Sequence, residues 1–138
     1  RSSDLTSRRV RASEIKHSKQ AAIATNLLDQ ARKNEDAQLW GEMASVVASE
    51  SAMFRTSGCV VLDIARVSAG SLDAAIIFRP QTVDLDLGVT LAMESGALTG
   101  DFSGNPSTGG ARQLVVANPK LFREVLKVLH PFRGRLPR

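Results

Sequence analysis

Several features are scarce or missing in this sequence of 138 residues. Aromatic residues make up only 4% of it although hydrophobic residues reach 43%, so we expect a core built mainly from Leu, Val, Ile and Ala. No apolar run approaches the roughly 20 residues of a membrane-spanning helix, and the polar start at residues 1–4 is unlike a signal peptide. The initiator Met is also missing, so we expect a processed chain or the ordered part of a longer one.

Cysteine is almost absent as well. Cys59 is the single thiol, so the chain can form no internal disulfide and no C-x-x-C metal motif. Proteins of a reducing compartment use cysteine in this sparing way. We therefore expect a cytoplasmic protein without a membrane partner.

The charge of the chain is basic, with a formal net charge of +4, and its basic residues gather near the two ends. A basic end can contact an acidic protein or a nucleic acid, and it can equally be a solvated surface. The pattern predicts a basic, partly ordered arm at 1–20, an α/β subdomain at 21–131 and a basic tail at 132–138. The residues that define the two ends are Arg8, Arg9, Arg11, Lys16, Lys19, Arg133, Arg135 and Arg138.

Short apolar segments alternate with stretches of helical periodicity through most of the chain. Such alternation favours a layered α/β fold in which a mixed, at least partly parallel sheet is flanked by helices. The loop at 103–110 is rich in Gly and Pro and reads as a mobile hairpin connection. The predicted strands are 21–25, 52–55, 72–78, 98–102 and 113–117, and the predicted helices are 36–49, 60–69, 82–95 and 119–130.

Helix ends and buried faces can be assigned within these segments. Thr82 is a suitable N-cap with Gly96 as terminator, and Asn118 followed by Pro119 is a typical start for the last helix. The spacing of apolar residues predicts which helix faces are buried. These faces consist of Leu39, Met43, Val46 and Val47; of Val60, Val61, Ile64, Ala65 and Ala69; and of Phe122, Val125, Leu126 and Leu129.

Five short segments resemble, in the correct order and with nearly the correct spacing, the motifs of one enzyme family. They are RTSGCVVLDIA (55–65), VSAGSLDA (67–74), DLDLGVTLAMESG (84–96), LTGDFS (98–103) and VVANPK (115–120). These segments resemble the carboxy-terminal half of the inositol monophosphatase family, in its bacterial extragenic-suppressor type. Residues 1–54 resemble the family only loosely.

The resemblance implies a layered αβαβα sandwich of which this chain supplies the carboxy-terminal half. It also implies an intact protein that hydrolyses inositol phosphate or a similar small phosphate ester with Mg²⁺, often with inhibition by lithium. In the family, most metal ligands lie in the sequence motifs G-x-E-x-x-E and D-P-[ILV]-D-G-T, and neither motif occurs in this chain. One carboxylate cannot hold two or three ions, so this chain alone is expected to be inactive.

Asp84 aligns with the metal-binding aspartate of the family's second half, and the resemblance makes it the candidate Mg²⁺ ligand. The alternative is a purely structural role, because an aspartate in the first turn of a helix complements the helix dipole by about 0.3–1 kcal/mol. Both interpretations place Asp84 at the start of the helix predicted over 82–95.

The segment Gly58-Cys59-Val60 aligns with family residues that contact the substrate, so these three residues are the candidate substrate-binding positions. A tight strand-to-helix junction would require small residues equally. The chain also departs from the family pattern. A thiol at Cys59 replaces a hydroxyl, the place of a substrate-binding glutamate falls within 76–78, which has no acidic residue, and Val83 replaces a tryptophan.

These departures leave two functions open. The first is a Mg²⁺-dependent phosphomonoesterase, and the alternative is a catalytically degenerate phosphatase fold that acts as a binding or regulatory partner. Family members bury this half against the other half and usually form dimers, so the resemblance also implies a homodimer. An isolated chain would expose apolar helix faces and is expected to associate.

Overall fold

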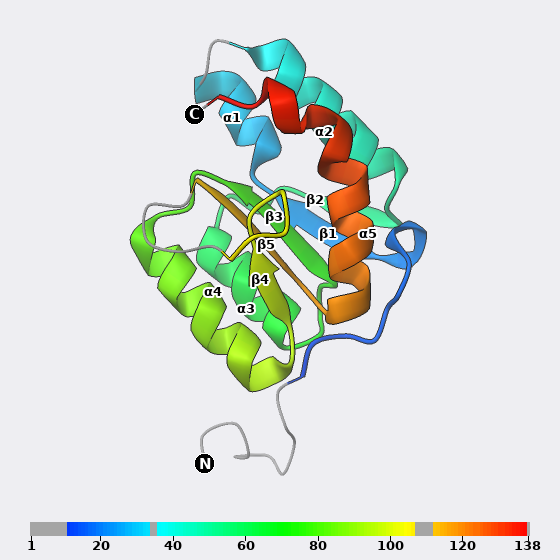
Figure 1. Ribbon diagram of the computed structural model, residues 1–138, viewed down its shortest axis with the longest axis vertical. Coiled ribbons are helices and arrows are strands. Elements are labelled where there is room, and N and C mark those ends of the chain that lie inside the picture. Colours follow the sequence, from blue (N-terminus) through cyan, green and yellow to red (C-terminus); the bar gives the residue numbers. More distant parts are fainter. Residues whose placement is uncertain (1–10, 34–35, 107–111, 138) are drawn as a thin grey trace.

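The computed structural model of the chain, which describes residues 11–33, 36–106 and 112–137, contains a five-stranded mixed sheet (Figure 1). The strand order is β2-β1-β3-β5-β4. Strand β1 runs parallel to both β2 and β3, whereas β5 is antiparallel to β3 and β4. The bounds are β1 (Ala22–Thr25), β2 (Met53–Arg55), β3 (Ala74–Phe78), β4 (Leu98–Gly100) and β5 (Gln113–Ala117).

Helices cover both faces of this sheet, which confirms the predicted layered α/β architecture (Figure 1). Helices α3 and α4 pack on one face, and α2 and α5 pack on the other. None of the helices in the described ranges has the length and apolarity to cross a lipid bilayer. Their bounds are α1 (Leu27–Lys33), α2 (Ala37–Ser49), α3 (Val60–Ser68), α4 (Thr82–Ser95) and α5 (Pro119–Leu129), with 3-10 turns η2 (Ser18–Gln20) and η3 (His130–Arg135).

Strand β3 is the centre of the fold. All five of its residues are apolar and buried, as expected of a strand covered by helices on both faces. In its antiparallel pairing with β5, Ile76 lies opposite Val115. This arrangement fixes the end of β3 in the middle of the sheet edge where the candidate site lies.

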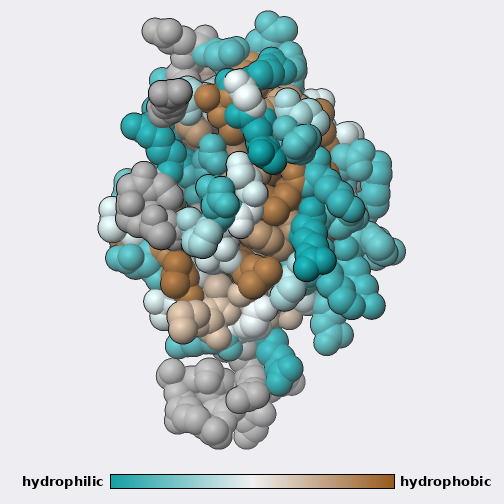
Figure 2. All heavy atoms as spheres, viewed as in Figure 1, coloured by the Kyte–Doolittle hydropathy of each residue, from teal (hydrophilic) through white to brown (hydrophobic). Residues whose placement is uncertain are grey.

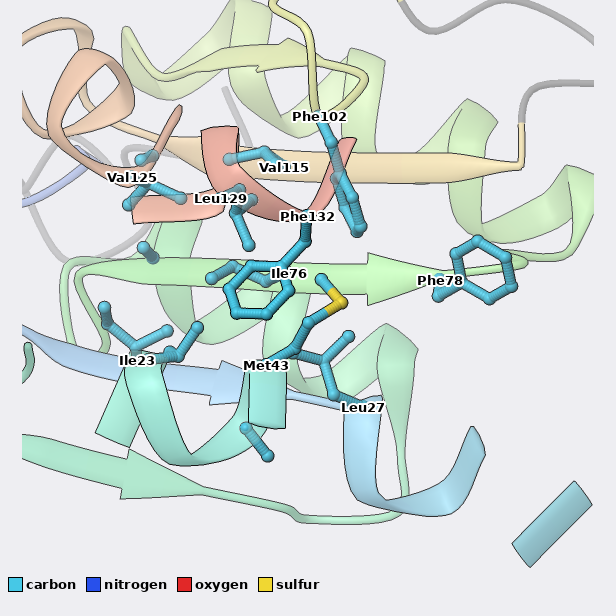
Figure 3. Close-up of a cluster of buried hydrophobic side chains, with 14 of the residues drawn as sticks. Ile23, Leu27, Met43, Ile76, Phe78, Phe102, Val115, Val125, Leu129 and Phe132 are labelled. Atoms are coloured by element: carbon cyan, nitrogen blue, oxygen red, sulfur yellow. The ribbon is translucent and has the colours of Figure 1, made fainter. Parts of the chain in front are cut away.

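The core on the α2 and α5 side contains most of the chain's few aromatic rings (Figure 3). Trp40 packs against Phe78 with ring centroids 4.5 Å apart. The ring centroids of Phe78 and Phe102 are 6.5 Å apart. All three side chains are buried. The expected aliphatic core is therefore built around an aromatic centre on this face, because each ring buries more apolar area than an aliphatic side chain.

The second core, between the sheet and helices α3 and α4, is aliphatic. Ile77 of β3 and Leu114 of β5 point into it from the sheet, and Ile64 and Leu85 meet them from the helices. Gly88 in α4 lets this helix approach closely, since a Cβ there would lie 3.5 Å from the Leu114 side chain. This layer holds the amino-terminal ends of α3 and α4 above the sheet edge.

Four details of the predicted elements need correction. Residues 27–33 form helix α1 where no element was expected, and β4 ends at Gly100 instead of residue 102. The N-cap of α4 is Gln81 instead of Thr82. The buried face of α3 is also different, because Val61 is exposed and the buried residues are Asp63, Ile64, Val67 and Ser68.

The amino-terminal segment that the structure describes is attached to the folded body. The Ala12 N–H donates to the Ser95 carbonyl oxygen at 3.1 Å. The Asn118 side-chain amide donates to the carbonyl oxygens of Ser13 and Ile15 at 2.9 and 2.7 Å. This segment therefore packs beside the end of α4 and the start of α5.

At the other end of the chain, packing continues past residue 131. Phe132 is buried in the α2 and α5 core, and the Arg135 guanidinium lies 2.9 Å from the Glu42 carboxylate. The predicted contact of the basic ends with an acidic partner stays a prediction. Of the basic ends, Arg8, Arg9 and Arg138 lie outside the described residues, as does half of the predicted loop at 103–110, from residue 107 to residue 110.

The two helical faces differ in surface character (Figure 2). The side that carries α5 is covered by hydrophilic side chains, because this helix is strongly amphipathic. Helix α4 instead has apolar residues on its outer side, with Val83, Val89 and Met93 all exposed.

Candidate ligand-binding site

A cavity of about 530 Å³ lies at the edge of the sheet where the parallel strands β1, β2 and β3 end. The chain leaves each of these strands and enters a helix, so loops and helix starts surround the cavity. Ligands of open α/β sheets bind at this carboxyl edge of the strands. The lining residues are Thr25, Asn26, Asp29, Gln30, Lys33, Gly58, Cys59, Val60, Val61, Asp63, Arg79, Gln81 and Asp84.

The segment Gly58-Cys59-Val60 forms one wall of the cavity. Gly58 has a φ of +78°, in the left-handed region that favours glycine. A Cβ at this position would meet nothing within 4 Å, so glycine is required by the backbone conformation and not by lack of space. The Ser57 hydroxyl accepts a hydrogen bond from the Cys59 N–H at 3.0 Å. Cys59 is exposed and precedes the first residue of α3.

Asp63 lies beneath this wall, in the first turn of α3, and is only 2% exposed. Its carboxylate accepts a hydrogen bond from the Ser57 hydroxyl at 2.7 Å. Burial raises the pKa of the Asp63 carboxyl, and the Ser57 hydrogen bond together with Arg66 and Arg55 offsets part of that rise. Asp63 thus holds the Ser57 hydroxyl, and through it the cavity wall, by a hydrogen bond.

Asp84 lies in the first turn of α4 and is 6% exposed. Its Oδ2 accepts a hydrogen bond from the Gln81 N–H at 2.9 Å, which is the contact that the third residue of a capping box makes. Asp84 also lines the cavity. Both interpretations of this residue are therefore compatible with its place, since a carboxylate retains acceptor capacity after one hydrogen bond.

The end of β3 forms the wall between these two segments. Asn26 accepts from the Phe78 N–H and donates to the Phe78 carbonyl oxygen, both at 2.8 Å. The next residue, Arg79, has a φ of +54° and lies in the left-handed region although it is not glycine. Arg79 lines the cavity, and its guanidinium carbon lies 5.3 Å from the centroid of the Phe78 ring.

The described residues of this chain do not make a two- or three-ion magnesium site by themselves. Three carboxylates, from Asp29, Asp63 and Asp84, line the cavity, but no three acidic, His or Cys side chains of the described ranges gather closely enough to hold a metal ion. Asp29 is also paired with Arg32. A magnesium site at Asp84 would need ligands from elsewhere.

The structure brings all four sequence-predicted site residues, Gly58, Cys59, Val60 and Asp84, to one cavity. It also places there Asn26, Asp29, Lys33, Asp63 and Arg79, which sequence reasoning missed. For two of these residues, the position in the sequence was a usable signal. Asn26 and Arg79 each follow a predicted strand directly, and the carboxyl ends of parallel strands meet at one edge.

Residues 76–78, where the resemblance would place a substrate-binding glutamate, are part of the core. The side chains of Ile76, Ile77 and Phe78 are all fully buried. Strand β3 therefore contributes no acidic group to the cavity.

Comparison with known proteins identifies relatives along nearly the whole chain, although no family model matches it. The Nus factor SuhB of Pseudomonas aeruginosa is 28% identical over 131 residues, which are 95% of this chain and 48% of that protein. The inositol-1-monophosphatase of Mycobacterium leprae is 33% identical over 77% of this chain and 35% of its own length. The chain thus spans about half the length, or less, of the curated relatives it matches.

Solved structures of the same group share the fold. The extragenic suppressor protein SuhB of Bartonella henselae matches with a TM-score of 0.77 at 22% identity, over 89% of this chain and 47% of that one. Inositol monophosphatase from Anabaena matches with a TM-score of 0.79 at 18% identity, over 91% and 49%. The chain therefore belongs to the inositol monophosphatase and SuhB family and corresponds to its carboxy-terminal half.

Proposed function

We propose that this chain forms the substrate-facing half of a magnesium-dependent phosphomonoesterase that acts on inositol phosphate or a similar small phosphate ester. The observation that carries the proposal is the convergence of Asp84 and Gly58–Val60 on one cavity of about 530 Å³. A volume in this range suits a small ligand. The relatives named inositol-1-monophosphatase and fructose-1,6-bisphosphatase/inositol-1-monophosphatase support the substrate class.

In this proposal Asp84 holds one Mg²⁺ from the start of α4, and the remaining ligands come from outside the described residues. A bound Mg²⁺ would polarise the phosphate and lower the pKa of a coordinated water. The chain's own part is to present the Asp84 carboxylate at a fixed helix start and to shape the cavity with Gly58, Cys59 and Val60.

The test is phosphate release from myo-inositol 1-phosphate by the full-length protein, with Mg²⁺, with EDTA, and with added Li⁺. We expect release that needs Mg²⁺ and falls about 10²-fold or more in Asp84→Asn, since an electrostatic contact to the reacting group is lost. Asp86→Asn, at an exposed position two residues on, is the matched control and should retain activity. The proposal is wrong if no phosphate monoester is turned over.

A second candidate is a binding or regulatory protein with a degenerate phosphatase site. It is favoured by the relatives named Nus factor SuhB, and by the Asp84 hydrogen bond to Gln81, which gives this carboxylate a structural role without any metal. In this case the protein captures a macromolecular partner, and Asp84→Asn leaves that capture unchanged. Capture that requires Mg²⁺ and Asp84 would contradict a purely structural role for the site.

A further inference from the structure

The exposed side of α5 is hydrophilic (Figure 2) and carries a row of positive charges. From residue 112 to residue 138 the sequence has seven Lys or Arg residues and a single acidic residue, Glu124. Lys120, Arg123 and Lys127 are all exposed and follow one another at intervals of three and four residues, so they lie along one side of the helix. At the rise of an α-helix, this row is about 10 Å long.

The segments beside α5 extend the row at both of its ends. The Ile15 carbonyl oxygen accepts from the Asn118 side chain at 2.7 Å, and the His17 ring lies 3.6 Å from the Glu124 carboxylate. Lys16, which is exposed between these two contacts, therefore lies beside the first turns of α5. The turn η3 follows α5 directly and adds a further exposed arginine. The five cations, which we call the basic face, are Lys16, Lys120, Arg123, Lys127 and Arg133.

Acidic residues neutralise little of the basic face. Glu124 lies 3.8 Å from Lys127, and Glu14 is the only other acidic residue in the segments 11–20 and 119–135. Three cations of the face have no ion pair and no side-chain hydrogen bond in the described part of the chain, namely Lys16, Lys120 and Arg123.

The acidic residues of α2 that flank this side of the molecule are paired with other cations. Glu50, at the end of α2, lies 3.6 Å from Lys19. Glu42 lies 2.9 Å from Arg135. The basic face therefore keeps its excess of positive charge.

The chemistry of the basic face fits a chain of phosphates better than another protein or a membrane. None of the large hydrophobic residues that are exposed in the described ranges lies on α5 or η3. Protein–protein interfaces have an apolar, aromatic-rich centre, whereas contacts to phosphate need only cations. Insertion into a membrane would need the apolar side of α5, which is buried in the core.

The shape of the nucleic acid also follows from the side chains that the face offers. Proteins bind single strands by stacking the bases on exposed aromatic rings, but Phe122 and Phe132 are both buried. The outward row on α5 holds only Lys and Arg, which can contact phosphates without reading bases.

We propose that the basic face binds the phosphate backbone of a nucleic-acid duplex without reading its sequence. Helix α5 packs on the opposite side of the sheet from α3 and α4, and none of the five cations lines the cavity. The inference therefore does not depend on the proposed phosphatase function.

Fluorescence anisotropy with the full-length protein and a labelled DNA duplex of about 20 base pairs tests the inference at several salt concentrations. We expect binding that weakens steeply as salt rises, because the cations displace counterions from the phosphates. Two duplexes of unrelated sequence should bind equally, and the corresponding single strand should bind less tightly.

The variant Lys120→Gln/Arg123→Gln should weaken duplex binding about tenfold or more at about 0.1 M salt, and should reduce the slope of log K against log salt by about 2. The matched control Arg32→Gln/Arg55→Gln removes the same charge from exposed positions on α1 and β2 and should bind like the wild type. All four positions are exposed, and circular dichroism checks that the fold is retained.

Several results would overturn the inference. Equal weakening by both double variants would show attraction by net charge without a specific face. Absence of duplex binding by the wild type at low salt, or tighter binding of the single strand, would exclude a duplex as the partner. Binding of polyglutamate that needs Lys120 and Arg123, without duplex binding, would identify an acidic protein as the partner instead.

Discussion

Asn26 and Phe78, which are 52 residues apart in the sequence, exchange two hydrogen bonds of 2.8 Å between the Asn26 side chain and the Phe78 backbone. The amide thereby completes the end of the sheet, in the manner of one more strand residue. It ties the turn that begins α1 to the end of β3, immediately before Arg79. The shape of the cavity at this wall depends on that pair of contacts.

Replacing Asn26 by Ala should therefore destabilise the protein. Two backbone groups of Phe78 lose their partner, and an unsatisfied buried group costs about 1–3 kcal/mol, so we expect a loss of about 2 kcal/mol or more in urea unfolding. Asn105→Ala, at an exposed position, is the control and should change stability by less than about 0.5 kcal/mol. Equal effects of the two substitutions would show that the Asn26 contacts contribute little.

The two roles of Asp84 can be separated by a pair of substitutions. Asp84→Asn keeps an oxygen that can accept from the Gln81 N–H but removes the charge, whereas Asp84→Ala removes both. We expect Asp84→Ala to lose about 1 kcal/mol of stability, as for other lost helix caps, and Asp84→Asn to lose less. Thermal unfolding measures this, and metal-dependent phosphate release should fall in both variants. Full activity in Asp84→Asn would exclude the metal-ligand role.

The raised pKa of the Asp63 carboxyl predicts a pH-dependent stability. Its folded-state pKa lies above its unfolded value, so the favourable contribution is complete below the unfolded pKa of about 3.9 and is lost as pH rises through the folded pKa. At neutral pH the buried charge of the Asp63 carboxylate therefore lowers the stability of the folded protein.

We expect Asp63→Asn to be more stable than wild type at pH 7, with the difference disappearing toward pH 4, in urea unfolding at several pH values. Asn keeps an oxygen acceptor for the Ser57 hydroxyl, so the contact within the cavity wall is retained. Asp86→Asn, at an exposed site, should show no such trend. A gain in stability that is the same at pH 4 and pH 7 would argue against titration of Asp63 as its source.

Most of the elements follow from local patterns in the sequence. Strand β5 and helix α5 have their predicted starts, because the apolar run at 113–117 is followed by Asn118 and Pro119, which begin a helix by their own chemistry. Strand β3 was predictable since its apolar run is too short for a helix. In these segments local preference and tertiary packing favour the same structure.

The features that were missed depend on packing and side-chain contacts that the periodicity of the sequence does not reveal. Helix α1 is seven residues long and mostly polar, and it is stabilised by packing of Leu27 into the core rather than by a periodic face of its own. The buried face of α3 includes Asp63 because the Ser57 hydroxyl donates a hydrogen bond to this carboxylate. The positive φ of Arg79 has no sequence signature, since it results from the surrounding structure, and only the place of Arg79 after a predicted strand could be read from the sequence.

Two glycines should respond oppositely to substitution by Ala. Gly70 has a φ of +80°, and its Cβ would lie 2.9 Å from the Arg11 carbonyl oxygen, so Gly70→Ala should cost about 1–2 kcal/mol for the backbone alone. Gly41 lies within α2 with nothing within 4 Å of its Cβ, so Gly41→Ala should gain about 0.5–1 kcal/mol. Thermal unfolding of both variants tests the comparison. Destabilisation by Gly41→Ala would contradict the open space described around it.

Helix α4 carries exposed apolar residues on its outer side, interspersed with the exposed polar residues Asp86, Thr90 and Glu94. Leu85 and Ala92 face the core, whereas Val89 and Met93 are 36% and 83% exposed. Exposed apolar residues that are grouped on one helix face are a feature of protein–protein interfaces. We therefore expect the 138-residue chain to form a dimer through the outer face of α4.

The double variant Val89→Gln/Met93→Gln should shift the chain toward monomer in analytical ultracentrifugation, because Gln places a polar amide at two exposed apolar positions of that face. Both positions are exposed, so the fold should be retained, and circular dichroism checks this. The matched control is Lys120→Gln/Arg123→Gln on the exposed side of α5, which should leave the sedimentation profile unchanged. A dimer that persists with the α4 substitutions and dissociates with the α5 substitutions would place the interface on the exposed side of α5 instead.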